Sequence, residues 1–115
     1  MKIDKDMLLM LKSSGLGDGE PDLGAKLMSS FLKVILESGS IPAKIICMGT
    51  GIFLTTEGSL VMDSLDKFAN GGSEILSCGT CLEYYKRTDR LVVGAPTNMR
   101  NTVQSLLNFG RILQP

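Results

Sequence analysis

The sequence predicts an α/β protein, a three-layer α/β/α sandwich with a mostly parallel sheet of about five strands. Short apolar runs, typical of strands covered on both faces, alternate along the chain with amphipathic segments at helical spacing. The connections between successive runs are about a dozen residues or longer, as parallel pairing requires. No linker, repeat or low-complexity tract divides the 115 residues, so we expect one domain over residues 1–115.

Five segments are predicted to be strands. The first two contain the apolar runs Met-Leu-Leu-Met-Leu and Lys-Ile-Ile-Cys-Met, and the third runs directly into Cys78. The last is expected at an edge of the sheet. In chain order, the predicted strands cover residues 6–12, 44–48, 74–77, 91–94 and 111–113.

Three amphipathic segments are predicted to be helices, and a shorter helix is expected over residues 79–86. The first begins after an N-cap at Asp22 and ends at Gly39, the second is closed by a Gly-Gly pair, and the third is capped by Thr97 or Asn98. The expected buried faces are Leu23, Leu27, Phe31, Val34 and Ile35 in the first helix, Val61, Leu65, Phe68 and Ala69 in the second, and Met99, Val103, Leu106 and Leu107 in the third.

The composition excludes several classes of function. The 12 basic and 12 acidic side chains balance, so no overall field attracts nucleic acid and no nucleic-acid partner is predicted. The absence of His excludes, within this chain, a Ser-His-Asp or Cys-His mechanism and a His-ligated metal. The apolar runs are far shorter than the ~20 residues of a membrane helix, so no membrane partner is predicted.

The first residues of the sequence and the number of its cysteines indicate the cellular compartment. The first residues set acids beside lysines and lack the apolar segment of a secretory signal, which predicts a cytoplasmic protein. Three cysteines, an odd number, are in that case expected to be reduced thiols rather than a disulfide framework.

The segment Cys78-Gly79-Thr80-Cys81 is the strongest candidate for chemistry because it lies where the third strand meets the short helix. The unpaired N–H groups of the first helical turn, including those of Gly79 and Thr80, and the positive end of the helix dipole favour a thiolate at Cys78. With spacing i, i+3, Cys81 lies on the same side of the turn, where it can attack a mixed disulfide or persulfide on Cys78. Cys78 and Cys81 are therefore the predicted catalytic residues.

Other interpretations of this motif remain open. The two cysteines can pack as small hydrophobic residues, or they can form half of a zinc site. Zinc is disfavoured because the only other thiol, Cys47, lies in an apolar strand and is expected in the core, so no metal is predicted. A thioredoxin-like arrangement is disfavoured because that fold places its motif early in the chain.

Three further loops are candidates for a functional site. In the glycine-rich residues 15–20, Glu20 stands where GxGxxG requires its third glycine, and acidic neighbours repel a pyrophosphate, so no cofactor is predicted. Thr55 and Thr56, after the second strand, and Asn98, after the fourth, are candidates for walls of the cysteine site, because ligands gather at the carboxyl ends of parallel strands. The two threonines can equally begin the next helix as its caps.

Three further pieces of the sequence form a recognisable pattern. They are Leu-Thr-Thr-Glu-Gly-Ser, Ile-Leu-Ser-Cys-Gly-Thr-Cys-Leu-Glu-Tyr-Tyr and Thr-Asn-Met, at residues 54–59, 75–85 and 97–99. With these pieces the sequence resembles the DsrE-like domain of YedF-type proteins, which are sulfurtransferase-like proteins associated with selenium metabolism. The resemblance runs from about residue 7 to residue 112.

The resemblance implies a DsrE-like α/β domain related to the sulfur-relay proteins of the DsrE and TusD type. In that wider family a cysteine at the end of a strand accepts sulfane sulfur as a persulfide and passes it on, and subunits commonly form oligomers. Cys78 is the corresponding position here, whereas Cys81 belongs to the narrower Cys-Gly-Thr-Cys form. The resemblance thus implies sulfur-donor and sulfur-acceptor proteins as partners, together with a homo-oligomer.

Two departures from the family pattern matter. YedF-type proteins usually carry an N-terminal TusA-like domain with a Cys-Pro motif, and the 115 residues contain no such domain. The alternatives for this chain are therefore a separately encoded domain, a fragment of a larger protein, or a subunit that receives sulfur from a TusA-like domain in trans. Relatives often carry Asn after the second strand, where this sequence has Gly49.

The function predicted from the sequence is that of a sulfur or selenium carrier or transferase that accepts sulfane sulfur on Cys78. The alternatives are a CxxC dithiol-disulfide redox protein, and a non-catalytic oligomer subunit or small-ligand binding module.

Overall fold

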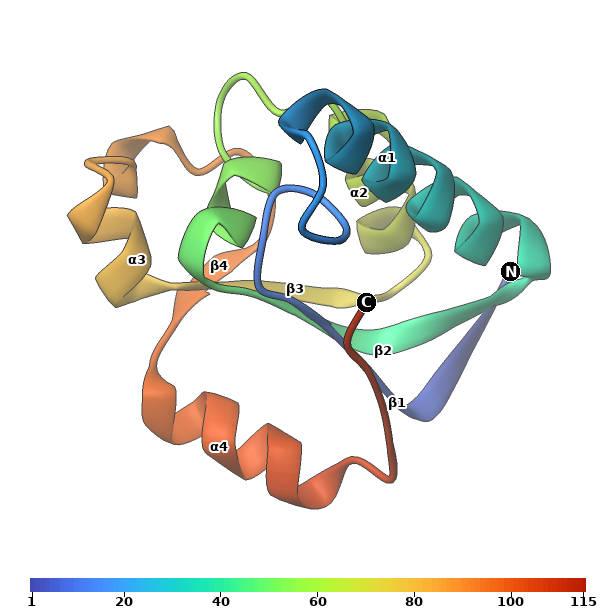
Figure 1. The fold of residues 1–115 in the computed structure, drawn as a ribbon. Helices are drawn as coiled ribbons and strands as arrows, with labels where there is room; N and C mark the ends of the chain where they lie inside the picture. The colour runs from blue at the N-terminus through green and yellow to red at the C-terminus, as the bar shows by residue number, and fades with distance from the viewer.

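The computed structural model describes residues 1–115 as five strands and four α-helices, with two 3₁₀ segments (Figure 1). In chain order the elements are β1 (Lys2–Leu11), α1 (Pro21–Ser38), β2 (Ser40–Cys47), η1 (Gly49–Leu54), α2 (Met62–Asn70), β3 (Glu74–Cys78), α3 (Gly79–Tyr84), η2 (Thr88–Arg90), β4 (Ala95–Thr97), α4 (Met99–Asn108) and β5 (Arg111–Leu113).

The five strands form one parallel sheet in the order β4-β3-β2-β1-β5. Figure 1 shows α1 and α2 on one face of this sheet and α4 on the other, which confirms the predicted three-layer α/β/α sandwich. β5 lies at an edge, as predicted. Because every strand runs the same way, the segments that follow β1, β2 and β3 all leave the sheet at one end.

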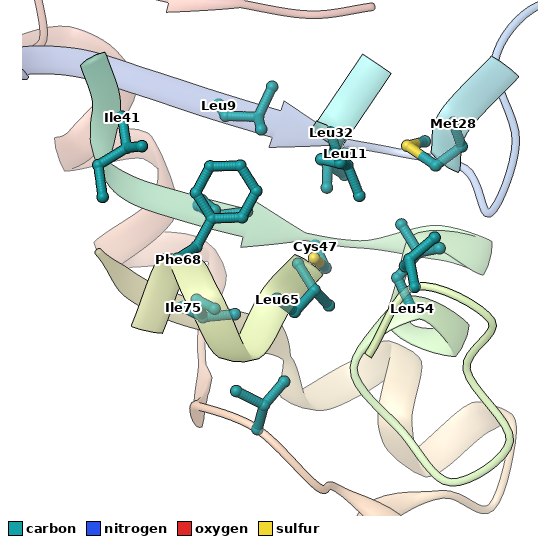
Figure 2. Packing of buried hydrophobic residues seen from close by; sticks show 13 residues of the cluster. Leu9, Leu11, Met28, Leu32, Ile41, Cys47, Leu54, Leu65, Phe68 and Ile75 are labelled. Atoms are coloured by element: carbon teal, nitrogen blue, oxygen red, sulfur yellow. The ribbon is translucent and has the colours of Figure 1, made fainter. Parts of the chain in front are cut away.

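The larger hydrophobic core lies between the sheet and the helices α1 and α2. Figure 2 shows its 13 buried residues, with Phe68 of α2 packed over the sheet. Successive residues of β1 point to opposite faces. Leu9 and Leu11 belong to this core, while Leu8 and Met10 join Ile46 in a smaller cluster on the α4 side. Burial on both faces explains the unbroken apolar run of β1.

The fourth strand was wrongly predicted, since it covers Ala95–Thr97 and not residues 91–94. Leu91 makes only an isolated antiparallel bridge to Thr56, and the side chain of Val93 enters the core. Gly94 has a φ of +78° and passes so close to the carbonyl of Ile75 that a Cβ would collide with it. Residues 91–94 therefore lead the chain to the sheet without pairing with β3, and strand pairing begins only after Gly94.

The expected buried face of α1 was correct only in part, since Phe31 and Ile35 pack partly buried against the larger core. The residues that α1 buries are Gly24, Met28 and Leu32, while Leu23, Leu27 and Val34 are exposed. The rotation of the helix is set at Gly24, whose carbonyl accepts a hydrogen bond from the N–H of Leu16 and whose backbone lies against Gly15.

The ends of α1 were predicted in part. The N-cap is Glu20 and not Asp22, because Pro21 takes the first helical position, where its missing N–H is not needed. The C-terminus lies at Gly39 in a left-handed conformation, as predicted.

The expected buried face of α4 was wrong for three of its four residues. Met99, Val103 and Leu107 are exposed, and only Leu106 packs against the smaller cluster. The residues that α4 buries are the polar Thr102 and Ser105. The face predicted for α2 is correct at Val61, Leu65 and Phe68. None of the helices has the length and apolar character needed to cross a bilayer.

Candidate functional site

Three connections that are distant in sequence meet at the carboxyl end of the sheet. The N–H of Met48 donates to the carbonyl of Leu11 at 3.0 Å, which joins the end of β2 to the end of β1. The N–H of Ser14 donates to Oγ1 of Thr50 at 3.2 Å, so the glycine-rich loop rests on η1. The N–H of Gly49 reaches the sulfur of Cys81 in α3. The segments after β1, β2 and β3 thus surround the cysteine motif.

Cys78 is the last residue of β3 and the residue immediately before α3. It pairs in register with Thr97 of β4, and only 8% of the residue is exposed. A Cβ on Gly79 would lie 3.2 Å from the carbonyl oxygen of Thr97, so the glycine allows the end of β4 to approach. The strand-to-helix position predicted for Cys78 is thus the position it occupies.

Cys81 lies one helical turn further on and is partly exposed. Its Sγ accepts a hydrogen bond from the N–H of Gly49 at 3.2 Å. Burial raises the pKa of the Cys81 thiol, and the Cys78 thiol raises it further, while the Gly49 N–H acts in the opposite direction. The net effect is a raised pKa, so Cys81 holds its proton and can donate it to the sulfur of Cys78.

Gly49 is the residue of this site that the sequence did not identify. Its φ is +57°, and a Cβ would lie 3.0 Å from the carbonyl oxygen of Lys12. Only glycine adopts this conformation without strain, and the conformation points the Gly49 N–H at Cys81. This position therefore contributes a backbone donor to the site. The available signal was a glycine directly after a predicted strand.

Thr55 and Thr56 lie inside the protein, with no exposed surface. The hydroxyl of Thr55 donates to the carbonyl of Ile52 at 3.1 Å and lies 2.7 Å from the hydroxyl of Ser77. The hydroxyl of Thr56 donates to the same carbonyl at 3.0 Å. These hydrogen bonds connect the end of η1 to β3 at the residue before Cys78. The two threonines therefore stabilise the backbone that carries the site and do not form its walls.

Asn98 and Thr80 lie on the surface near the cysteines. Asn98 follows β4, and its Oδ1 accepts a hydrogen bond from the N–H of Asn101 at 2.8 Å. This is the N-cap of α4 that the sequence predicted. Thr80 lies in the first turn of α3, where backbone N–H groups have no intrahelical partner.

Cys47 lies in the larger core, as its apolar surroundings predicted (Figure 2). It pairs in register with Ser77, whose side chain points to the opposite face of the sheet from that of Cys78. Complete burial raises the pKa of Cys47 to about 12. The thiol of Cys47 is therefore separated from the other two by the sheet.

A second link that the sequence did not identify ties the end of α3 to η1. Arg87 Nη1 donates to the carbonyl of Glu57 at 2.8 Å and to Oγ1 of Thr56 at 3.3 Å. The guanidinium also lies 4.7 Å from the centre of the Phe53 ring. This cation therefore holds the framework around the cysteines together instead of facing their sulfur atoms.

Comparison with known proteins identifies the fold. No protein-family model matches the chain, and no curated protein matches it. Solved structures do match, and they show that the chain has the DsrE-like fold of YchN.

Three of these structures cover almost the whole chain. MTH1491 from Methanobacterium thermoautotrophicum, a protein of unknown function, has a TM-score of 0.72 at 10% identity, over 97% of this chain and 100% of its own. The YchN protein from E. coli has a TM-score of 0.68 at 13% identity, over 97% and 100%. BT1422 from Bacteroides thetaiotaomicron, a conserved protein of unknown function, has a TM-score of 0.64 at 17% identity, over 96% and 95%.

Proposed function

We propose that this protein is a cytoplasmic carrier that accepts sulfane sulfur on Cys78, as the resemblance to the DsrE and TusD sulfur-relay proteins implies. The observation that supports it best is the position of two thiols one helical turn apart at the carboxyl end of β3, with Cys81 held by the N–H of Gly49. A carrier needs one sulfur that attacks and a nearby proton donor that stabilises it. The raised pKa of Cys81 suits the second role.

The loading step transfers one sulfur atom without net oxidation or reduction. The thiolate of Cys78 attacks the outer sulfur of a donor persulfide, R–S–SH, and the S–S bond of the donor breaks. The donor leaves as R–S⁻ and takes up a proton, while Cys78 becomes a persulfide. The N–H groups of Gly79 and Thr80, with the S–H of Cys81, stabilise the anionic sulfur before and after transfer.

Two routes lead away from the persulfide. An acceptor thiolate attacks the outer sulfur and regenerates the Cys78 thiolate. Alternatively, the Cys81 thiolate attacks the inner sulfur, which forms a Cys78–Cys81 disulfide and releases hydrogen sulfide. The raised pKa of Cys81 disfavours the second route at neutral pH, because it keeps the attacking group protonated. We therefore assign Cys81 primarily to proton donation.

The partners of such a carrier are sulfur-donor and sulfur-acceptor proteins, among which a TusA-like domain acting in trans would serve as donor. Exposed apolar residues on two layers of the sandwich support a homo-oligomer. They are Leu23, Leu27 and Val34 on α1, with Met99, Val103 and Leu107 on α4.

A dithiol-disulfide redox function is the second candidate, favoured by the position of the two thiols one helical turn apart. The low exposure of Cys78 favours the third, in which the cysteines only pack within an oligomer subunit or a small-ligand binding module. Intact-mass measurement after exposure to a persulfide donor separates the three, with Cys78→Ser, Cys81→Ser and the buried control Cys47→Ala compared with the unchanged protein.

Each candidate gives a different pattern. A carrier gains the mass of one sulfur atom, retains it in Cys81→Ser and Cys47→Ala, and loses it in Cys78→Ser. A redox protein loses two hydrogens in the unchanged chain and in Cys47→Ala, does not lose them in Cys78→Ser or Cys81→Ser, and retains no added sulfur in any sample. No change of mass in any sample leaves packing as the role of the cysteines and refutes sulfur transfer.

A further inference from the structure

A polar cleft lies on the α4 side of the sheet, and one of its lining residues, Thr97, is the register partner of Cys78. The volume of the cleft is about 420 Å³, and only two of its ten lining residues are hydrophobic, so a ligand that fits it must be polar. Its lining residues come from β2, β3 and β4, which form the floor, and from α4 and Phe109, which form the roof. Figure 1 shows α4 facing the sheet on this side.

The cleft exists because α4 lies on the sheet with its polar side inward. A helix that only covers a sheet normally buries its apolar face. Here α4 buries Thr102 and Ser105, and it packs apolar groups only near its C-terminal end, where Leu106 and Phe109 meet the smaller cluster. The rest of the helix leaves open space above the sheet, lined by polar groups that packing alone does not require.

The floor of the cleft presents one positive and one negative side chain next to each other. Lys44 of β2 and Glu74 of β3 are register partners, and Nζ of Lys44 lies 3.5 Å from Oε1 of Glu74. This separation is longer than the ~2.7–2.9 Å of a close charge-assisted hydrogen bond, and the Glu74 side chain is 61% exposed. The pair is loose enough for a ligand carrying both charges to enter between its members.

Lys44 is fixed in position for such a ligand. Its side chain is only 24% exposed, its Nζ donates to Oγ of Ser105 at 3.0 Å, and the same atom lies 5.8 Å from the centre of the Phe109 ring. An ammonium group has three donors. Within this arrangement one donor reaches Ser105, and the others are free for an incoming carboxylate once Glu74 turns to the ligand's ammonium group.

The roof supplies amide groups. Asn101, Gln104 and Asn108 follow the spacing i, i+3 and i+7, which places them on one face of α4. The side-chain amides of Asn101 and Gln104 make no hydrogen bond in the structure, whereas the Asn108 amide donates to the carbonyl of Gln104 at 2.8 Å. The free amides can pair with a polar ligand side chain.

We propose that this cleft binds a free α-amino acid with a polar side chain. The ligand's carboxylate lies on Lys44, its ammonium group on Glu74, and its side chain under the amides of Asn101 and Gln104. This binding site goes beyond sulfur transfer and does not depend on the thiols. It gives α4 a function in ligand binding.

The test is isothermal titration calorimetry on the full chain under reducing conditions. L-Glutamine is the probe, and its two matched analogues each lack one charge: 4-carbamoylbutanoate has no amine and 4-aminobutanamide has no carboxylate. We expect L-glutamine to bind with a dissociation constant of about 1 mM or lower. Each analogue should bind roughly tenfold more weakly or worse, because it leaves one charged partner unmatched.

Variants locate the site. Lys44→Met and Glu74→Gln should each weaken L-glutamine binding by roughly tenfold or more, and Gln104→Ala, at an exposed position, should weaken it without disturbing the fold. Lys33→Met, an exposed lysine of α1 on the other face of the sheet, is the matched control and should leave binding unchanged. Cys78→Ser should also bind normally, which separates this proposal from sulfur transfer.

Several outcomes would overturn the proposal. They are no binding of L-glutamine at roughly ten times the expected dissociation constant, equal binding of all three probes, and equal loss of binding in Lys33→Met and Lys44→Met. The side-chain amide NMR signals of Asn101 and Gln104 give a second readout. They should shift on titration with L-glutamine, and unchanged signals would place any bound ligand elsewhere.

Discussion

The backbone N–H of Gly49 donates a hydrogen bond to the sulfur of Cys81 at 3.2 Å, across 32 positions of the sequence. The bond joins the end of β2 to the helix that carries the second cysteine. Burial and the Cys78 thiol raise the pKa of Cys81, and the hydrogen bond from Gly49 lowers it. The thiol pair is therefore tuned by a backbone group whose direction depends on a left-handed glycine.

Gly49→Ala tests this contact. Alanine at a φ of +57° is strained, and its Cβ would lie 3.0 Å from the Lys12 carbonyl oxygen. We expect the free energy of unfolding to fall by about 1–2 kcal/mol and the pKa of Cys81 to rise further, because the donor that lowers it moves away. Urea denaturation and the ultraviolet titration of thiolate absorbance measure the two effects.

Gly17→Ala is the matched control for that substitution. Gly17 has a φ of +78°, and nothing lies within 4 Å of its missing Cβ. It should lose stability through backbone strain and leave the Cys81 titration unchanged. A Cys81 pKa that moves equally in both variants, or in neither, would contradict the role given to the Gly49 N–H.

Cys78→Ala should lower the pKa of Cys81. The neighbouring Cys78 thiol raises that pKa, and alanine removes this influence. Burial still acts on Cys81, so we expect its pKa to remain above the ordinary value. Thiolate titration of the variant measures the change, and an unchanged or higher Cys81 pKa would show that the two sulfurs do not interact.

Cys47 should make the protein less stable at high pH. Its pKa is about 12 in the folded protein against an ordinary value of 9.0, so the unfolded chain loses this proton first. The contribution of Cys47 is therefore complete below pH 9 and is lost as the pH rises towards 12, at about 1.4 kcal/mol per pH unit.

Denaturation at a series of pH values, with Cys47→Ala as the reference, measures this slope. The variant should show a shallower decline than the unchanged protein over the same range. Identical slopes would mean that Cys47 ionises with equal ease in both states. In native alkylation at neutral pH we expect Cys47 to remain unmodified, because it is buried and protonated.

Thr55→Val should destabilise the fold by about 1–3 kcal/mol, because it leaves the buried hydroxyl of Ser77 without its partner at 2.7 Å. Ser77→Ala should have a similar effect for the reciprocal reason. The double variant should lose less stability than the sum of the two single variants, and a double-mutant cycle in urea measures the difference. Simple additivity would mean that the hydroxyl pair does not hold η1 to β3.

The sequence by itself determined the fold class, because alternating apolar and amphipathic segments depend only on local spacing. It also determined the strand-to-helix position of Cys78, the cap at Asn98 and the end of α1 at Gly39, since each depends on neighbouring residues. Periodicity was also sufficient for α2, whose apolar stripe is the face that it buries.

Only the tertiary structure decided which face α1 and α4 turn to the sheet. Both helices carry more apolar residues than their buried face accepts, so periodicity alone misplaces part of the buried face of α1 and most of that of α4. In α1 the contact of Gly24 with Gly15 sets the rotation, and in α4 the hydrogen bond from Lys44 to Ser105 draws a polar face inward. The Gly49–Cys81 hydrogen bond and the polar cleft also depend on the tertiary structure. Each brings together groups that become neighbours only when the strands pair.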